Sequence, residues 1–130
     1  MAKANVDRAE TGRLARKSGR FAEYVALVHL LLKGYRILGF RLKLPQGEID
    51  ILAQKGKRLA MVEVKSRLTL EAAMESVDDN QQHRLWQAGL ALQSRRKALQ
   101  ALDLNIDLYT LAPGQWPIHA INAFERNERF

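Results

Sequence analysis

The strongest structural signal in this 130-residue chain is a pair of segments, Gly47-Glu-Ile-Asp-Ile-Leu-Ala-Gln54 and Arg58-Leu-Ala-Met-Val-Glu-Val-Lys-Ser66. Both segments are short and rich in aliphatic residues, as strands are. The polar connection between them, Lys55-Gly-Lys57, suits a tight turn. We therefore predict two strands, at about 48–54 and 58–66, that form a hairpin.

Charged side chains occur at defined positions in this predicted hairpin. Residues two apart in a strand share a face, so Glu63 and Lys65 lie side by side while Val62 and Val64 point the other way. Across the hairpin, Asp50 can lie opposite the charged pair. A carboxylate pair binds a hard divalent cation, and a neighbouring ammonium stabilises an anion or orients a water. This combination suits the hydrolysis of a phosphodiester.

The alternative interpretation is an ordinary polar strand face, with Glu63 and Lys65 as a solvated ion pair. One observation favours the metal site. Glu48 and Asp50 are also two residues apart, so both strands present acids on one face. Like charges that face each other across a sheet are destabilising, and a cation or a basic partner would relieve that cost. We expect the apolar residues of both strands to share the opposite face: Ile49, Ile51, Val62 and Val64.

Length and composition limit the class of protein. A chain of this size forms one domain with a substantial core, which we place at residues 18–130. The sequence contains no cysteine, which excludes disulfides and thiolate metal sites. No apolar run approaches the roughly 20 residues of a membrane span, and the first ten residues lack the apolar core of a secretory signal. We therefore expect a cytoplasmic protein without a membrane partner.

The net charge of +7 is unevenly distributed. Residues 1–46 carry ten Lys or Arg against three acids, whereas residues 47–80 carry five against seven. A basic surface attracts polyanions without reading their sequence. Basic flanks around an acidic centre therefore suit an enzyme that acts on nucleic acid, although mild basicity without a specific role is the alternative. We predict residues 1–17 to be a basic arm, either loose or a frayed helix.

Hydrophobic periodicity predicts the first helix and the strand that follows it. The helix would begin near Ser18 and end at Gly34, with a strand at 35–44. Its apolar residues recur at helical spacing: Phe21, Tyr24, Val25, Val28, Leu31 and Leu32.

The second half of the chain predicts one long helix and two strands. Acidic turn residues 78–80 precede the helix, and strands are expected at 104–111 and 117–124. The predicted order is α-β-β-β-α-β-β. One apolar stripe is compatible with the long helix: Leu85, Gly89, Leu92, Leu99 and Leu102.

Five blocks of the chain, in their order and spacing, resemble the YraN-like proteins. The blocks are Gly19-Arg-Phe-Ala-Glu23, Gly34-Tyr35, Gly47-Glu-Ile-Asp50, Val62-Glu-Val-Lys65 and Ile121-Asn-Ala-Phe124. This family of small, largely uncharacterised bacterial proteins is assigned to the restriction-endonuclease-like, or PD-(D/E)XK, nuclease superfamily, which includes archaeal Holliday junction resolvases. The resemblance implies an α/β fold of the restriction-endonuclease-like, three-layer kind, with a central mixed β-sheet flanked by helices.

The resemblance also implies roles for individual residues. Asp50 and Glu63 would bind Mg²⁺ or Mn²⁺, and Lys65 would be the catalytic lysine beside the attacking water. Glu23 would complete the acidic set directly or through a water, and Gln82 would lie near the scissile phosphate. From the residues alone, Glu23 and Gln82 are equally compatible with solvated helix positions. An ammonium beside two acids favours an electrostatic or orienting role for Lys65 over that of a free-amine base.

The sequence departs from the family pattern at three positions. Ile49 replaces the proline of the superfamily, Gln81 stands where members carry a lysine, and Asn105 stands where they carry an arginine. The last two changes remove positive charge that would contact phosphate, which affects substrate affinity more than metal binding. Six basic side chains are candidate nucleic-acid contacts: Arg20, Arg67, Arg84, Arg95, Arg96 and Lys97.

The function implied is a metal-dependent endonuclease that hydrolyses structured or branched DNA, with DNA favoured over RNA. Symmetric cleavage of two strands would require a homodimer. Two alternatives remain open: a nucleic-acid-binding or adaptor module that keeps the fold without turnover, and a basic protein bound to RNA–protein assemblies. Trp86 and Trp116 suit either base stacking or packing.

Overall fold

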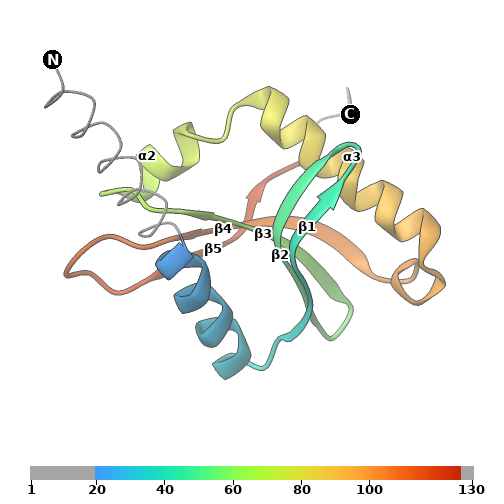
Figure 1. Ribbon diagram of the computed structural model, residues 1–130, viewed down its shortest axis with the longest axis horizontal. Coiled ribbons are helices and arrows are strands. Elements are labelled where there is room, and N and C mark those ends of the chain that lie inside the picture. Colours follow the sequence, from blue (N-terminus) through green and yellow to red (C-terminus); the bar gives the residue numbers. More distant parts are fainter. Residues whose placement is uncertain (1–19, 127–130) are drawn as a thin grey trace, which may run out of the picture.

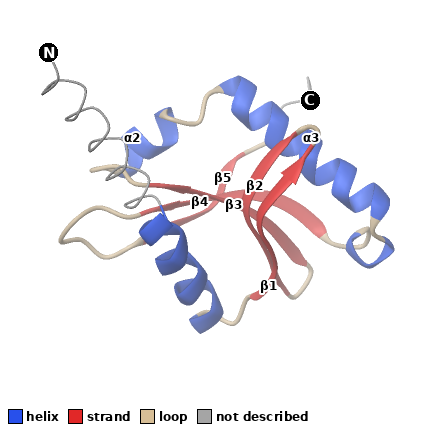
Figure 2. Ribbon diagram, viewed as in Figure 1, coloured by secondary structure: helices blue, strands red, loops and turns tan. Residues whose placement is uncertain are grey.

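The computed structural model describes residues 20–126, in which a five-stranded sheet lies between helices on its two faces (Figures 1 and 2). The predicted arm at 1–17 and the predicted cap Ser18 lie outside the described residues. The described chain begins in a helix at residues 20–32, here the N-terminal helix. The other elements are β1 (Arg36–Leu44), β2 (Gly47–Lys55), β3 (Arg58–Lys65), α2 (Leu70–Glu75), α3 (Asp79–Arg95), a 3₁₀ turn (Lys97–Leu99), β4 (Asp103–Thr110) and β5 (Ile118–Phe124).

The sheet is mixed, with the strands in the order β1-β2-β3-β4-β5. Strands β1, β2 and β3 pair antiparallel, β3 and β4 pair parallel, and β5 is antiparallel to β4. A parallel pair needs a crossover connection, which α2 and α3 supply on one face of the sheet. The N-terminal helix covers the other face (Figure 2). The predicted α/β fold with a central mixed sheet and flanking helices is confirmed.

Two apolar clusters hold the three layers together. On the face of α2 and α3, strand residues such as Leu52, Met61 and Ile106 pack with Leu85 and Trp86 of α3. The cluster on the face of the N-terminal helix contains fewer buried residues than the cluster on the other face. They are Ala26, Leu30, Tyr35, Ile51, Ala53, Ala60, Val62 and Tyr109. The middle strand β3 is buried on both faces over most of its length, so its two charged residues near the carboxyl end are exceptional.

Two glycines are required by the geometry at their positions, for different reasons. A Cβ at Gly89 would come within 2.5 Å of the sulfur of Met61, so only glycine lets α3 lie this near β3. Gly34 has a φ of +91°, which ends the N-terminal helix in a conformation that favours glycine.

The structure corrects the predicted elements in two places. The short helix α2 was not expected from the sequence; Thr69 caps it by accepting a hydrogen bond from the amide of Ala72. Helix α3 ends at Arg95, because Arg96 takes an extended conformation. Leu99 and Leu102 therefore do not continue the helical stripe, and Leu99 reaches the core from the 3₁₀ turn.

One apolar residue of the predicted hairpin lies on a different face from the one expected. Ile51 and Val62 pack under the N-terminal helix, with Val64 at the edge of the same cluster. Ile49 instead joins the cluster of α3. The reason is that the pairing of β2 with β3 runs only as far as Ile51 and Val62, and β2 diverges beyond that point.

The outward face of the N-terminal helix is unusually apolar. Phe21, Tyr24, Val28 and Leu31 are exposed, whereas the helix contacts the sheet through small or aliphatic residues, including Ala26 and Leu30. Among residues 20–126, no helix combines the length and the apolar run that crossing a bilayer would require.

Candidate metal centre

Asp50 lies at the fork where β2 separates from β3. The two strands pair from Lys55 and Arg58 up to Ile51 and Val62. Beyond Ile51 the backbones no longer pair. The side chain of Asp50 satisfies β3 there, because its Oδ2 accepts a hydrogen bond of 2.9 Å from the backbone amide of Val64. The local geometry of the fork therefore fixes the orientation of this carboxylate.

Glu63 is held beside it on β3, and only 5% of the residue is exposed. Its Oε1 accepts a hydrogen bond of 2.9 Å from the side-chain amide of Gln81. The Nζ of Lys65 lies 3.6 Å from the same oxygen. Gln81 is itself positioned by the start of α3, where the N-cap Asp78 accepts a 2.8 Å hydrogen bond from its backbone amide.

A cavity of about 290 Å³ opens onto this pair of acids. Its lining residues come from β2, β3 and the first turns of α3: Gly47, Glu48, Asp50, Glu63, Gln81, Arg84 and Leu85. The buried carboxylate of Glu63 and the partly buried one of Asp50 therefore line a hollow that a ligand can enter.

Both acids are poorly compensated for the loss of water around them. Burial raises the pKa of Asp50 to about 6; the hydrogen bond from Val64 opposes this, and the charges of Glu23 and Glu48 add to it. Burial also raises the pKa of Glu63 to about 8, and the charge of Asp50 adds to that effect, against the lowering effects of Lys65 and Gln81. The pair thus lacks the positive charge that two ionised carboxylates need.

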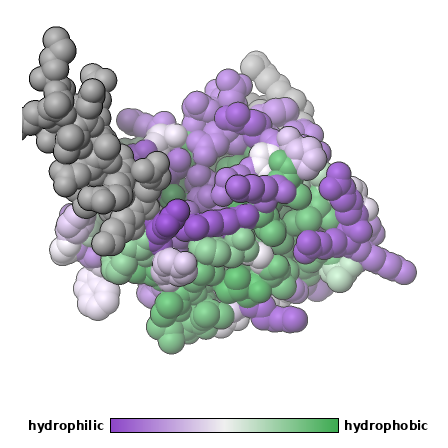
Figure 3. All heavy atoms as spheres, in the orientation of Figure 1, coloured by the Kyte–Doolittle hydropathy of each residue, from purple (hydrophilic) through white to green (hydrophobic). Residues whose placement is uncertain are grey.

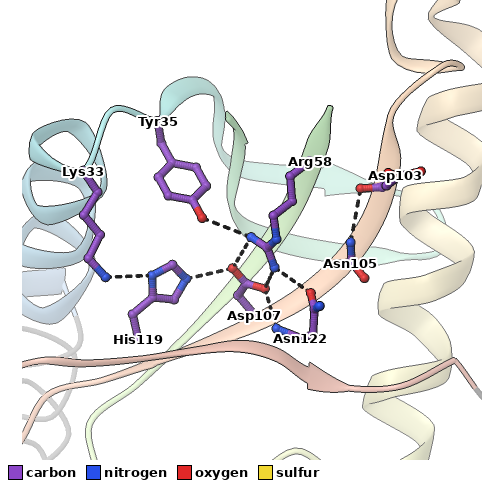
Figure 4. Close-up of polar contacts among 8 residues, drawn as sticks. All are labelled: Lys33, Tyr35, Arg58, Asp103, Asn105, Asp107, His119 and Asn122. Atoms are coloured by element: carbon purple, nitrogen blue, oxygen red, sulfur yellow. Dashed lines mark hydrogen bonds and ion pairs between the residues drawn. The ribbon is translucent and has the colours of Figure 1, made fainter. Parts of the chain in front are cut away.

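A second buried acid shows how this fold compensates a carboxylate elsewhere. Asp107 on β4 is fully buried, and it accepts hydrogen bonds from Arg58, from the ring of His119 and from the backbone of Asn122 (Figure 4). Burial alone would raise its pKa, but the hydrogen bonds outweigh burial and lower the pKa to about 2. Lys33 contacts the other ring nitrogen of His119 at 3.0 Å. In contrast to the fully paired Asp107, Asp50 and Glu63 are only partly compensated, since the raising effects on their pKa outweigh the lowering effects of Val64, Lys65 and Gln81.

The structure places Glu23 near the acids but pairs it with another residue. The guanidinium of Arg41 lies 2.6 Å from its Oε2, and the charge of Glu23 contributes to the raised pKa of Asp50. Arg41 has a φ of +51°, which is unusual for a residue with a side chain. Within the described part of the chain, no three acidic or histidine side chains come together as a metal cluster.

The other predicted site residues divide into near and distant groups. Gln82 turns away from the cavity, since its amide donates to the carbonyl of Val77 at 3.0 Å, and Gln81 occupies the position beside Glu63. Arg84 lines the cavity. Arg20 and Arg67 are exposed, with Arg67 bonded to the carbonyl of Ser66.

The basic cluster at residues 95–97 lies at the far end of α3. Arg95 lies fourteen positions after Gln81 along this helix, which corresponds to about 21 Å at the usual rise. These three side chains are exposed, and they are not part of the cavity.

The donor set suits a hard divalent cation. Mg²⁺ is commonly held by one or two carboxylates together with waters and substrate oxygens, and Asp50 and Glu63 supply two. The chemistry of this pair, acidic and short of positive charge beside an open cavity, fits Mg²⁺ or Mn²⁺.

Two residues that contribute to the site, Gln81 and Arg41, were not identified as such from the sequence. The cap at Asp78 could have indicated the inward direction of Gln81, but no pattern indicated that Arg41 binds Glu23.

Comparisons with known proteins place the chain among bacterial relatives. The sequence model described as "Uncharacterised protein family UPF0102" matches residues 22–109. A UPF0102 protein of Caulobacter sp. (strain K31) is 52% identical over 113 residues, which cover 87% of this chain and 81% of that protein. A UPF0102 protein of Caulobacter vibrioides (strain NA1000 / CB15N) is 50% identical over 117 residues, covering 90% and 94%. A UPF0102 protein of Chelativorans sp. (strain BNC1) is 43% identical over 110 residues, covering 85% and 89%.

Proposed function

The chain belongs to the protein family UPF0102, and from the geometry of its site we propose that it is a metal-dependent endonuclease of the PD-(D/E)XK superfamily. The observation that carries the proposal is a pair of adjacent acids, the buried Glu63 and the partly buried Asp50, which are poorly compensated by the nearby Lys65 and face an open cavity. A protein that only bound nucleic acid would have no use for acids that raise the free energy of the folded state and repel phosphate.

The metal and the protein would contribute different parts of the chemistry. A Mg²⁺ or Mn²⁺ ion bound by Asp50 and Glu63 would lower the pKa of a water and polarise a phosphoryl oxygen. The amide of Val64 holds the carboxylate of Asp50, and Gln81 holds that of Glu63, so both ligands are oriented before the ion arrives. Lys65, partly exposed at 3.6 Å from Glu63, can donate to the attacking water or to the oxygen on which negative charge develops.

Positive charge around the cavity is suited to a phosphate backbone. Arg84 is exposed at the cavity, and in the proposed complex it would contact a phosphate next to the one that is cut. The chain as a whole carries a net charge of +7, which favours association with a polyanion. The preference for structured or branched DNA rests on the resemblance to archaeal resolvases.

The test is cleavage of end-labelled substrates in Mg²⁺ and in Mn²⁺: duplex, single strand, fork and four-way junction DNA, and an RNA hairpin. We expect cleavage of branched DNA by the parent chain and its loss in Glu63→Gln and Lys65→Ala. Matched controls are Glu75→Gln and Lys57→Ala, which make the same chemical changes at exposed positions outside the cavity; both should cut at the rate of the parent.

The other outcomes select other functions. Equal cleavage by all five proteins would mean that a contaminating nuclease is responsible. Tight DNA binding in chelator, without cleavage in either metal, would contradict the proposal and favour the binding or adaptor module. Cleavage of the RNA hairpin alone would keep the mechanism and change the substrate.

A further inference from the structure

The N-terminal helix carries a second apolar stripe that the described part of the chain leaves more than half exposed, although the ring of Tyr24 lies 5.8 Å from that of Phe40. Phe21, Tyr24, Val28 and Leu31 are 63%, 55%, 57% and 56% exposed. The helix already buries a different face against the sheet, through Ala22, Ala26 and Leu30. A helix that packs on one side only is normally polar on the other, so the outer stripe needs a different explanation.

The spacing of the stripe is that of a helix–helix contact. Its four residues are separated by three, four and three positions, as the a and d residues of two heptads are. Two heptads alone would not form a stable coiled coil. Here the helix is held in place by the sheet, so it does not have to be ordered when a partner binds.

A groove beside the helix enlarges the same surface. It has a volume of about 450 Å³ and lies between the helix and the β4–β5 loop, where Trp116 is 90% exposed and Leu32 is 80% exposed. Figure 3 shows hydrophobic side chains gathered over the N-terminal helix, in the lower part of the view. Phe21, Tyr24 and Trp116 alone expose on the order of 400 Å².

We propose that this face pairs with the same face of a second copy of the chain, with the two N-terminal helices antiparallel about a two-fold axis. Together with Leu32 and the aliphatic residues of the stripe, the exposed area of this surface is comparable to the roughly 800 Å² per partner of a standard interface and lies above the about 300–600 Å² patch of an ordinary monomer. A two-fold interface requires a surface that complements itself, and an a/d stripe does so.

The charge distribution is compatible with a second copy at this face. Two chains that each carry +7 repel each other over most approaches, but none of the four stripe residues is charged. In the antiparallel arrangement, Phe21 of one copy faces Leu31 of the other, and Tyr24 faces Val28. The dipoles of the two helices are then antiparallel, so that the positive end of each lies beside the negative end of the other, which is favourable. This inference does not depend on the proposed nuclease activity.

The first test is the mass of the full chain by sedimentation equilibrium. We expect twice the chain mass of 14.8 kDa for the parent and a single chain mass for Val28→Glu. The matched control, Ala101→Glu, introduces the same side chain at an exposed position after the 3₁₀ turn and should remain dimeric. The proposal would be overturned if the parent remained monomeric over a 100-fold range of protein concentration. It would also be overturned if the Val28→Glu protein remained dimeric.

The second test reads the direction of pairing. The chain has no cysteine, so Phe21→Cys and Leu31→Cys each introduce a single thiol at an exposed site. In the antiparallel pair these two positions adjoin, while each lies about 15 Å along the axis from its own equivalent, too far for a disulfide. Mild oxidation should link a mixture of the two variants at least tenfold more than either alone. Equal linkage of single variants, or a dimer that never links, would contradict this arrangement.

Discussion

Replacing Asp50 with asparagine should make the metal-free protein more stable, although the change removes a residue that we place at the centre of the site. Asparagine keeps an oxygen that can accept the hydrogen bond from the amide of Val64. It removes a partly buried negative charge, and with it the repulsion that helps to raise the pKa of Glu63. A site built for a cation is expected to be strained in its absence.

The magnitude and its pH dependence follow from the pKa of Asp50. The difference between its ordinary value of 3.8 and the raised value of about 6 corresponds to about 3 kcal/mol. A carboxyl whose pKa is higher in the folded state destabilises the fold once it must ionise. The parent therefore loses stability as the pH rises from about 4 to about 6, with Glu63 extending the loss to about pH 8. The advantage of Asp50→Asn should be absent at pH 4 and complete above pH 6.

The assay is urea denaturation of both proteins in chelator at pH 4, 6 and 8.5. Asp103→Asn is the matched control, because Asp103 is exposed; its free energy of unfolding should follow that of the parent at every pH. If Asp50→Asn were less stable than the parent at pH 8.5, or if its effect did not vary with pH, the reasoning that links burial to an uncompensated charge would be refuted.

Three further changes test other parts of the structure. Asp107→Asn should lower the free energy of unfolding by about 2 kcal/mol at pH 7, measured by urea denaturation, because the lowered pKa of Asp107 stabilises the fold above about pH 4. The difference from the parent should vanish as the pH falls toward 2. Gly89→Ala should cost about 1–3 kcal/mol, measured in the same way, because its Cβ would overlap the sulfur of Met61. Gln81→Lys should stabilise the metal-free protein at pH 8.5 by about 1 kcal/mol, because the new ammonium would pair with the carboxylate of Glu63. The same change should steepen the salt dependence of DNA binding in a fluorescence titration. An unchanged slope would mean that position 81 does not reach phosphate.

The hairpin and its acids were the part of the chain most predictable from sequence. Alternation in 48–54 and 58–66 placed Ile51 and Val62 on one face, and the cluster that they share confirms this. What alternation could not give is the fork at Asp50, since the end of strand pairing depends on the twist of the whole sheet. For the same reason the position of Ile49 was predicted wrongly.

The N-terminal helix illustrates a different limit. Periodicity identified a helix, but the strongest stripe in the sequence faces outward, and the sheet is contacted by smaller residues such as Ala22 and Ala26. Hydrophobicity alone does not say which of two apolar faces packs inside the same chain. The contact of Arg41 with Glu23 was equally unpredictable, because it joins a helix and a strand 18 residues apart through a backbone conformation that no local pattern signals.

Binding of Mn²⁺, followed by the electron paramagnetic resonance signal of the free ion, tests the metal centre most directly. At pH 8.5 the parent should remove Mn²⁺ from solution, and Glu63→Gln should not, whereas the exposed-site control Glu75→Gln should bind as the parent does. Binding of the parent should weaken toward pH 6, because the ion must displace protons from Asp50 and Glu63. A parent that leaves the Mn²⁺ signal unchanged at pH 8.5, or a Glu63→Gln protein that binds equally well, would contradict the assignment of these two acids as a metal site.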